Sequence, residues 1–319
     1  LSPVHYAEGT DRLTNADLIR RFPDYSSDDI VKRTGIESRP YCSHNQNALS
    51  MAIDAAQKAL AAENLTINDL TGIVCHTTTP PLNTPSMASM VLNALAPSGD
   101  AELKVYALDA VHNTIQLYHD SAVLVVTTEC LSRVVNPDDF GTAILFGDAA
   151  TATIARGNIE PEQGPGERAS ARVSPDYSTI PAGSMVLSQP VLAGKADPAH
   201  GCEGRGHTTK QGKRVFTEAA RAMTKMTNQA FERSGAALGD LDWLVPHQAN
   251  ARILEAARIR LKIPQEKIIN LIDVHGNTSS SSIPISIAKS TDKFKPGNIV
   301  GVCAFGGGFT FGAAILEIV

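Results

Sequence analysis

The sequence predicts an α/β protein of layered sheets and helices, built from two similar halves. Three observations lead to this prediction: short β-branched runs, amphipathic helical segments between them, and an internal repeat. The apolar runs do not alternate with polar residues, which is typical of strands buried on both faces of a sheet.

Two amphipathic helices are expected from the spacing of apolar residues. One covers residues 49–62, where apolar side chains recur every three or four positions. The other opens at Phe216, and Gly235 is expected to end it, because glycine readily adopts the left-handed conformation that closes a helix. Strands are expected at residues 72–74, 123–126, 268–269 and 299–302.

An internal repeat supports a duplicated half. Residues 69–76 reappear in similar form as residues 240–247, and residues 146–152 resemble residues 305–311, in the same order. We therefore expect an N-terminal half over 1–155 and a C-terminal half over 211–319. The stretch 156–210 between them is rich in Gly, Pro and His and is expected to be a loop-rich excursion.

The repeat also predicts a shortfall in the first half. Between the expected strand end at Asp273 and the next strand start at Asn298 lie 25 positions, enough for a full helix. The matching interval from Asp109 to Ala122 is only 13 positions. About a dozen residues are thus missing where the second half has room for a central helix.

Composition places the chain among globular proteins and excludes several functions. Its 319 residues are 43% hydrophobic and 19% charged, so a large core can be buried. The net charge of -5 argues against nucleic-acid binding. No apolar run approaches the roughly 20 residues that span a bilayer, and the start lacks a signal-peptide pattern, so no membrane and a cytoplasmic location are expected.

The five cysteines are scattered, odd in number and without the close pairs of metal or redox sites, so we expect reduced thiols and no metal centre. Each is more often a small buried side chain than a nucleophile. They are Cys42, Cys75, Cys130, Cys202 and Cys303.

Three features of the second half are candidates for chemistry. His247 follows an apolar strand, and Asn277 opens a turn of small and hydroxyl residues that enters a helix. Near the end of the chain, Gly306 and Gly307 would let backbone N–H groups approach a substrate oxygen closely. Taken singly, such a histidine is more often structural, and glycine runs usually mark turns.

Together and in this order, these features resemble the β-ketoacyl-acyl carrier protein synthase III family over nearly the whole chain. Further motifs carry the resemblance, at residues 13–18, 33–39, 77–80, 84–88 and 146–150. It implies a thiolase-like fold with an α-β-α-β-α layer order, a homodimer, and no cofactor beyond acyl thioesters carried on coenzyme A or acyl carrier protein.

The resemblance also implies a Cys-His-Asn triad and a decarboxylative Claisen condensation. An acyl group would move from a thioester carrier to the cysteine, and the enolate of a malonyl-type thioester would then attack it. His247 and Asn277 would donate hydrogen bonds to the enolate oxygen, and Gly306 and Gly307 would hold the acyl oxyanion through backbone N–H groups.

The chain departs from the family at the nucleophile. The strand ending at Asp109 runs directly into residues 110–114, which contain no cysteine, and none of the five cysteines is a convincing substitute. Two explanations compete: the sequence lacks a segment that the natural protein has, or the deletion is real. Losing a central helix would cost more free energy than the typical stability of a folded protein, which is about 5 to 15 kcal/mol. This favours the first explanation.

The resemblance also bears on the substrate. Family members that use coenzyme A hold its adenine between a Trp and an Arg, and the matching positions here are Asp29 and Phe140. This favours a donor on a carrier protein or a different coenzyme A pose. Thr84 is expected in the acyl pocket, and its small size hints at a longer acyl chain. A basic patch could contact a carrier protein or phosphopantetheine, although it could equally be a solvated helix face; it comprises Arg252, Arg258, Arg260 and Lys262.

Two other functions stay open from sequence. One is acyl transfer to an oxygen or nitrogen nucleophile without decarboxylation. The other is a non-catalytic subunit that pairs with an active synthase; it would explain a missing cysteine, but the presence of His247 and Asn277 counts against it.

Overall fold

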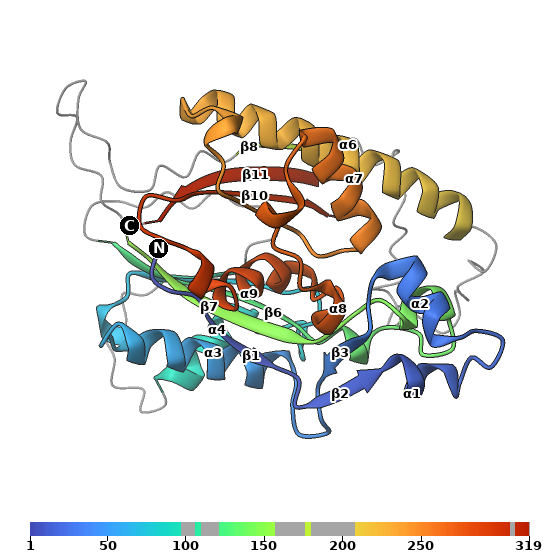
Figure 1. The fold of residues 1–319 in the computed structure, drawn as a ribbon. Coiled ribbons are helices and arrows are strands. Elements are labelled where there is room, and N and C mark those ends of the chain that lie inside the picture. The colour runs from blue at the N-terminus through green and yellow to red at the C-terminus, as the bar shows by residue number, and fades with distance from the viewer. Residues whose placement is uncertain (97–105, 110–120, 157–175, 180–207, 307–309, 319) are drawn as a thin grey trace.

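The protein is a five-layered α-β-α-β-α structure, as Figure 1 shows for a computed structural model of the chain. The described residues are 1–96, 106–109, 121–156, 176–179, 208–306 and 310–318. Two sheets lie roughly parallel, with helices outside each and a pair of short helices between them. The predicted α/β fold class and layer order are confirmed.

The first sheet is formed by residues up to 156. Its strand order is β1 (His5–Glu8), β7 (Ala149–Arg156), β6 (Ala122–Glu129), β4 (Gly72–His76) and β5 (Tyr106–Asp109). Strand β4 pairs in parallel with both β5 and β6, whereas β7 pairs antiparallel with β6 and β1.

The second sheet repeats this pattern. Its strand order is β8 (Asp176–Thr179), β11 (Thr310–Glu317), β10 (Ile299–Gly306) and β9 (Trp243–Pro246). Strands β9 and β10 are parallel and β10 and β11 antiparallel, which reproduces the β4-β6-β7 arrangement of the first sheet. In each half a 3₁₀ turn precedes the first of these strands, at Ile67–Asp69 and at Leu238–Asp240. The sequence repeat is therefore a repeat of structure.

Helices fill the other layers. Helices α3 (Ala48–Ala62) and α4 (Met87–Leu95) cover the outside of the first sheet, and α6 (Thr208–Ser234) and α7 (Ala251–Leu261) that of the second. The short helices α8 (Ile272–His275) and α9 (Ser282–Ala288) lie between the sheets. Beside them stand α1 (Asn15–Ile19), α2 (Ser27–Thr34), α5 (Phe140–Ala143) and the hairpin of β2 (Asp11–Thr14) with β3 (Ser38–Tyr41).

Local chemistry explains where the main helices begin and end. The Asn47 side chain accepts a hydrogen bond from the backbone N–H of Ser50 at 2.9 Å and so caps the start of α3. Helix α6 ends at Gly235 with φ of +74°, as the sequence predicts. Helix α2 ends at Gly35, where a Cβ would come within 2.3 Å of the Ala251 Cβ, so only glycine lets α2 approach α7 this closely.

Three expectations about secondary structure were wrong, and the stretch expected to be loop-rich contains one described strand. Residues 268–269 form no strand but a single bridge to Leu244, because the preceding turn and the following loop leave room for only one pairing. Asp273 does not end a strand but lies in α8. Strand β8 lies inside the predicted excursion, and α6 begins well before Phe216, since its polar first turns show no apolar periodicity. The predicted shortfall falls largely on residues 110–120, outside the described residues.

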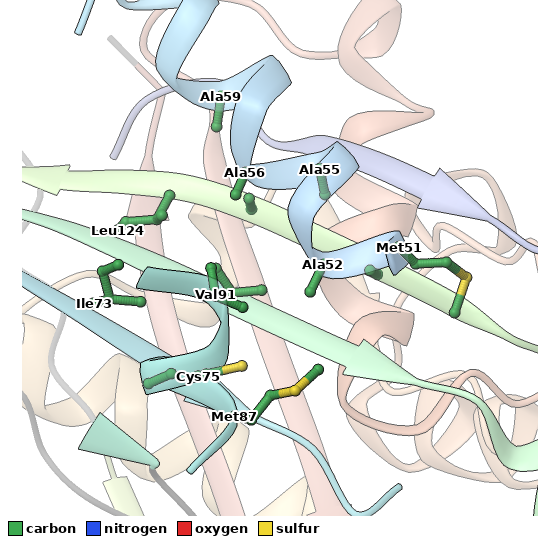
Figure 2. Packing of buried hydrophobic residues seen from close by; sticks show 14 of the residues in the cluster. Met51, Ala52, Ala55, Ala56, Ala59, Ile73, Cys75, Met87, Val91 and Leu124 are labelled. Carbon is green, nitrogen blue, oxygen red and sulfur yellow. The ribbon is translucent and has the colours of Figure 1, made fainter. Parts of the chain in front are cut away.

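Each half has its own hydrophobic core. Figure 2 shows the first, in which Ala52, Ala55, Ala56 and Ala59 of α3 face the buried strands. The second lies between α6 and the second sheet and uses larger side chains, among them Met223, Met226, Phe231, Phe305 and Phe311. A helix lined with alanine can lie close to its sheet, whereas the second half fills its interior with long and aromatic groups.

Candidate active site

His247 lies at the carboxyl end of β9. Its backbone N–H donates to the carbonyl oxygen of Cys303 at 2.8 Å, which continues the parallel pairing of β9 with β10. Carboxyl ends of parallel strands are where α/β sheets place their ligands. The second sheet therefore delivers this side chain to a position suited to chemistry.

The His247 ring is held on two sides. Its Nδ1 lies 2.6 Å from the Oγ of Ser282, the first residue of α9, and the Phe305 ring meets it edge-on at 5.5 Å between centroids. His247 as a residue is half-buried, and the protein atoms around its ring lower its pKa to about 4 by desolvation. The imidazole is thus neutral near pH 7.

Asn277 is held by two backbone hydrogen bonds between the two halves. Its backbone N–H donates to the Leu145 carbonyl at 2.8 Å, and its carbonyl accepts from the Gly147 N–H at 3.1 Å. Close approach requires glycine on both sides: a Cβ on Gly147 would lie 2.3 Å from the His275 carbonyl oxygen, and one on Gly276, where φ is +60°, 2.7 Å from that of Leu145. The motif at residues 146–150 is therefore the support of Asn277.

The Asn277 side chain is oriented as a donor. Its Oδ1 accepts from the backbone N–H of Ser279 at 2.8 Å. This fixes the amide so that Nδ2 points the other way, and among the described residues Nδ2 has no hydrogen-bond partner. Its two N–H groups are available to a substrate oxygen.

The serine run that follows Asn277 ties the middle layer to both sheets. The Ser280 hydroxyl donates to Glu129 at 3.2 Å, and that of Ser281 donates to the Ala149 carbonyl at 3.1 Å and lies 3.0 Å from the Thr127 hydroxyl. Ser282 contacts His247. The sequence indicated only a tight turn here, although it has four consecutive serines, of which Ser281 and Ser282 are buried.

Glu129 is a site residue that the sequence did not reveal. It ends β6, is fully buried, and accepts hydrogen bonds from the Thr78 backbone and hydroxyl and from the hydroxyls of Thr79 and Ser280. Burial raises its pKa, while these donors work in the opposite direction. Glu129 thereby joins the loop after β4 to the turn that carries Asn277.

Of the two glycine candidates, only Gly306 lies within the described residues. Gly306 ends β10 and pairs with Thr310 across the hairpin. Gly307 lies outside the described residues. Their role in holding an oxyanion stays a prediction.

The predicted basic patch on α7 is not uniform. Arg252, Arg260 and Lys262 are exposed, and the Arg252 guanidinium lies 5.8 Å from the Phe216 ring. Arg258 instead forms two hydrogen bonds with the Glu255 carboxylate, at 2.7 and 2.6 Å. Three cations of the four are thus presented to solvent, while the charge of Arg258 is largely engaged.

An open hollow of about 390 Å³ lies between α2, α6 and α7. Arg252 and Glu255 stand on its wall beside apolar residues, including Val31, Phe216 and Ile259. Both Val31 and Ile259 are exposed.

Thr84 is exposed on the loop before α4. It lines neither this hollow nor a second, smaller one that lies beside β2. Its place in an acyl pocket stays a prediction.

The two positions that hold adenine in coenzyme A-dependent family members are differently occupied. Phe140 stacks on Tyr25 with ring centroids 3.6 Å apart and planes 9° apart. The Arg33 guanidinium lies 5.3 Å from the centroid of the Tyr25 ring and 5.6 Å from that of the Phe140 ring. Asp29 accepts hydrogen bonds from Ser26 at the start of α2. Phe140 is therefore already paired within the protein.

All four described cysteines are buried. The hydrogen bond from Cys42 lowers the pKa of Cys130. Burial raises the pKa of Cys303 to about 12. A hydrogen bond to Cys130, burial and the Asp148 carboxylate all raise the pKa of Cys42. Potential ligand atoms of Cys42, Cys130 and Asp148 lie within 4.8 Å of one another, but Asp148 already accepts from the backbone N–H groups of Cys42 and Ser132.

Comparison with known proteins agrees with this geometry. Residues 104–168 match the family model of 3-oxoacyl-[acyl-carrier-protein] synthase III, and residues 231–318 match the model of its C-terminal part. None of the helices in the described part of the chain is long and apolar enough to cross a membrane.

Relatives cover nearly the whole chain. The β-ketoacyl-[acyl-carrier-protein] synthase III of Oleidesulfovibrio alaskensis is 35% identical over 96% of this chain and 94% of its own length. That of Bacillus pumilus is 34% identical with the same coverage. The crystal structure of the Aquifex aeolicus synthase III superposes with a TM-score of 0.79 at 27% identity, covering 99% of this chain and 98% of that one. The chain therefore belongs to the β-ketoacyl-[acyl-carrier-protein] synthase III family of thiolase-fold condensing enzymes.

Proposed function

We propose that this condensing enzyme joins an enzyme-bound acyl group to a malonyl-type thioester, with His247 and Asn277 as the two donors to the enolate oxygen. The carrying observation is that a neutral His247 is held by Ser282, while Asn277, whose Nδ2 has no partner among the described residues, rests on Leu145 and Gly147 of the first half. Neutral donors suit a step in which negative charge develops on an oxygen.

The reaction proceeds in two stages. An enzyme thiolate attacks the carbonyl of the acyl donor, and the carrier leaves as a thiolate that takes up a proton. The malonyl-type thioester then loses CO₂, and the electron pair of the broken C–C bond becomes an enolate. The enolate carbon attacks the acyl-enzyme carbonyl, a C–C bond forms, and the enzyme thiolate leaves with release of the β-ketoacyl thioester.

A cysteine nucleophile after β5 belongs to this proposal. The described cysteines Cys42, Cys75, Cys130 and Cys303 are all buried, and Cys130 lies 3.8 Å from the Asp148 carboxylate. We place the nucleophile on a segment of the natural protein between Asp109 and Ala122. The intact mass of the natural protein tests this: the proposal requires more than the 33.8 kDa of the given sequence, and a further increase of one acyl group after incubation with an acyl thioester.

We also propose that the acyl donor arrives on an acyl carrier protein. Phe140 is stacked on Tyr25, and Asp29 is engaged in capping α2, so neither is free to hold adenine as the family's Trp and Arg do. The exposed cations of α7 beside the apolar hollow suit the acidic surface and phosphopantetheine arm of a carrier protein. A homodimer is part of the same proposal.

Product analysis tests the proposed reaction. The purified enzyme, with an acyl carrier protein as acyl donor and malonyl carrier protein labelled in its free carboxyl group, should release labelled CO₂ and form a β-ketoacyl product. Acyl transfer to an alcohol or amine without CO₂ release would show acyltransfer instead. Absence of both acylation and CO₂ release would indicate a non-catalytic subunit.

A further inference from the structure

We propose that Ser282 is the positioning residue that sets the tautomer of His247, so that the imidazole presents Nε2–H to the substrate. The inference rests on the proposed role of His247, but it concerns a different residue and a property that can be measured without turnover. The hydroxyl of Ser282 and the ring of His247 come from different parts of the chain, α9 and the end of β9, 35 positions apart.

The Ser282 hydroxyl has two hydrogen-bond partners among the described residues. Its Oγ lies 2.6 Å from His247 Nδ1 and receives the backbone N–H of Gln248 at 3.3 Å. A hydroxyl carries one proton to donate and accepts through its lone pairs. The Gln248 N–H can only donate, so within the described residues Nδ1 of His247 is the only acceptor that the Ser282 proton has.

Ser282 is buried and only 1% exposed. If Nδ1 carried the imidazole proton, two donors would face Oγ and the serine proton would be left without an acceptor in the protein interior. Leaving a buried donor unsatisfied costs about 1 to 3 kcal/mol. With the proton on Nε2, both contacts are satisfied at once.

The surroundings hold this arrangement in place. Gln248, also 1% exposed, donates to the Pro246 and Ile269 carbonyls at 2.7 and 3.2 Å and accepts from the Leu271 N–H at 3.0 Å. The loop that presents both His247 and the Gln248 N–H is therefore fixed. The edge-on contact with Phe305 restricts rotation of the ring. His247 Nε2 has no hydrogen-bond partner among the described residues, which leaves it available to a ligand.

The group facing His247 Nδ1 is a hydroxyl and not a carboxylate. A carboxylate at Nδ1 would favour the imidazolium and the opposite tautomer, as in triads where histidine acts as a base. A serine hydroxyl can donate to a neutral ring and leave it neutral. The structure thus pairs His247 with a group that makes it a hydrogen-bond donor at Nε2 and not a base there.

Nitrogen NMR of the natural enzyme labelled with ¹⁵N-histidine tests the inference directly, because the proton-bearing and bare ring nitrogens differ in chemical shift and in coupling to the ring protons. A His247→Gln variant assigns the signals of this residue among the nine histidines. The expected result is Nε2 protonated and Nδ1 bare at pH 7. A protonated Nδ1 in the unmodified enzyme would overturn the inference.

Variants of Ser282 extend the test. In Ser282→Ala the His247 signals should shift towards a mixture of tautomers, and the rate of malonyl decarboxylation should fall about 10- to 100-fold. Ser282→Thr keeps the hydroxyl and should restore both readouts. Ser286→Ala is the matched control: it removes another buried serine hydroxyl of α9, which donates to the Ser282 carbonyl at 2.7 Å, and should leave the His247 signals unchanged.

The outcomes separate this inference from the proposed function. If the tautomer is as stated but no condensation occurs, the proposed reaction fails and the role of Ser282 in setting the tautomer stands. If condensation occurs and Ser282→Ala changes neither the His247 signals nor the rate, the inference is wrong. Thermal unfolding of each variant shows whether it is folded; should Ser282→Ala not fold, the Ser282→Thr variant and the natural enzyme still decide the tautomer.

Discussion

The two halves place a histidine at the same point of the fold and give it different partners. His76 ends β4 as His247 follows β9, in matching positions of the repeat. His76 Nδ1 lies 3.9 Å from the buried carboxylate of Glu129, whereas His247 Nδ1 lies 2.6 Å from the Ser282 hydroxyl. One neighbour is a carboxylate and the other a hydroxyl, so the duplicated framework alone does not decide the surroundings of the histidine.

The supports are divided unequally as well. The first half contributes a hydrogen-bonded frame, through Leu145, Gly147 and Glu129, on which the turn carrying Asn277 rests. The second half contributes both candidate donors. Within the described residues, the first half therefore holds the turn of Asn277 in place, while the side chains of both candidate donors come from the second half.

The largest expected effect separates the two histidines. His247→Ala should lower the rate of malonyl decarboxylation about 100- to 1,000-fold, because it removes a donor to the developing negative charge. His76→Ala, measured in the same CO₂-release assay, should lower it less than about tenfold. Equal losses in both variants would remove the functional distinction between the halves.

Each core should lose stability, the second when a side chain is made smaller and the first when one is made larger. Met226→Ala leaves a cavity beneath α6 and should cost about 2 to 5 kcal/mol in the free energy of unfolding. Ala56→Leu overfills the close contact between α3 and the first sheet and should cost about 1 to 3 kcal/mol. Denaturant unfolding measures both. A neutral Ala56→Leu would show that the α3 interface is not closely packed.

The pH dependence of stability sharpens the comparison at His247. Its pKa is about 4 in the folded protein against 6.5 for the ordinary side chain, so the unfolded chain takes up a proton at a higher pH than the native one. The contribution of the neutral His247 ring to the free energy of unfolding is complete above pH 6.5. It declines as the pH falls and is lost below about pH 4. This contribution to the free energy of unfolding is below about 3 kcal/mol, because His247 as a residue is only half-buried.

Chemical unfolding between pH 7 and 4 measures this contribution. The natural enzyme should lose stability more steeply than His247→Gln, whose side chain does not titrate. Parallel curves for the two proteins would contradict the neutral state of His247 on which the proposed mechanism depends.

The smallest expected effects lie on α7. Arg258→Ala should leave carrier-protein affinity nearly unchanged, because the charge of Arg258 is engaged by Glu255. Arg252→Glu should weaken binding of an acyl carrier protein, mainly through the association rate and most strongly at low salt. Titration at two ionic strengths measures both, and identical behaviour of the two variants would argue against docking at the hollow.

Several features were determined by the sequence alone. Apolar runs and helical periodicity predicted β4, β6, β10 and α3, since burial on one or both faces leaves a pattern in local sequence. The repeat predicted the duplicated architecture. The motifs around His247 and Asn277 indicated the family through their order along the chain.

Only the tertiary structure decided how those residues are held. Glu129 carries no local signal, since its importance comes from Thr78, Thr79 and Ser280, which reach it from other parts of the chain. The pairing of residues 145–147 with Asn277, and of Ser282 with His247, joins positions far apart in sequence. Periodicity records which face of an element is buried, but hydrogen-bond partners and burial of charge depend on which elements meet, and that is fixed when the two sheets close on the middle layer.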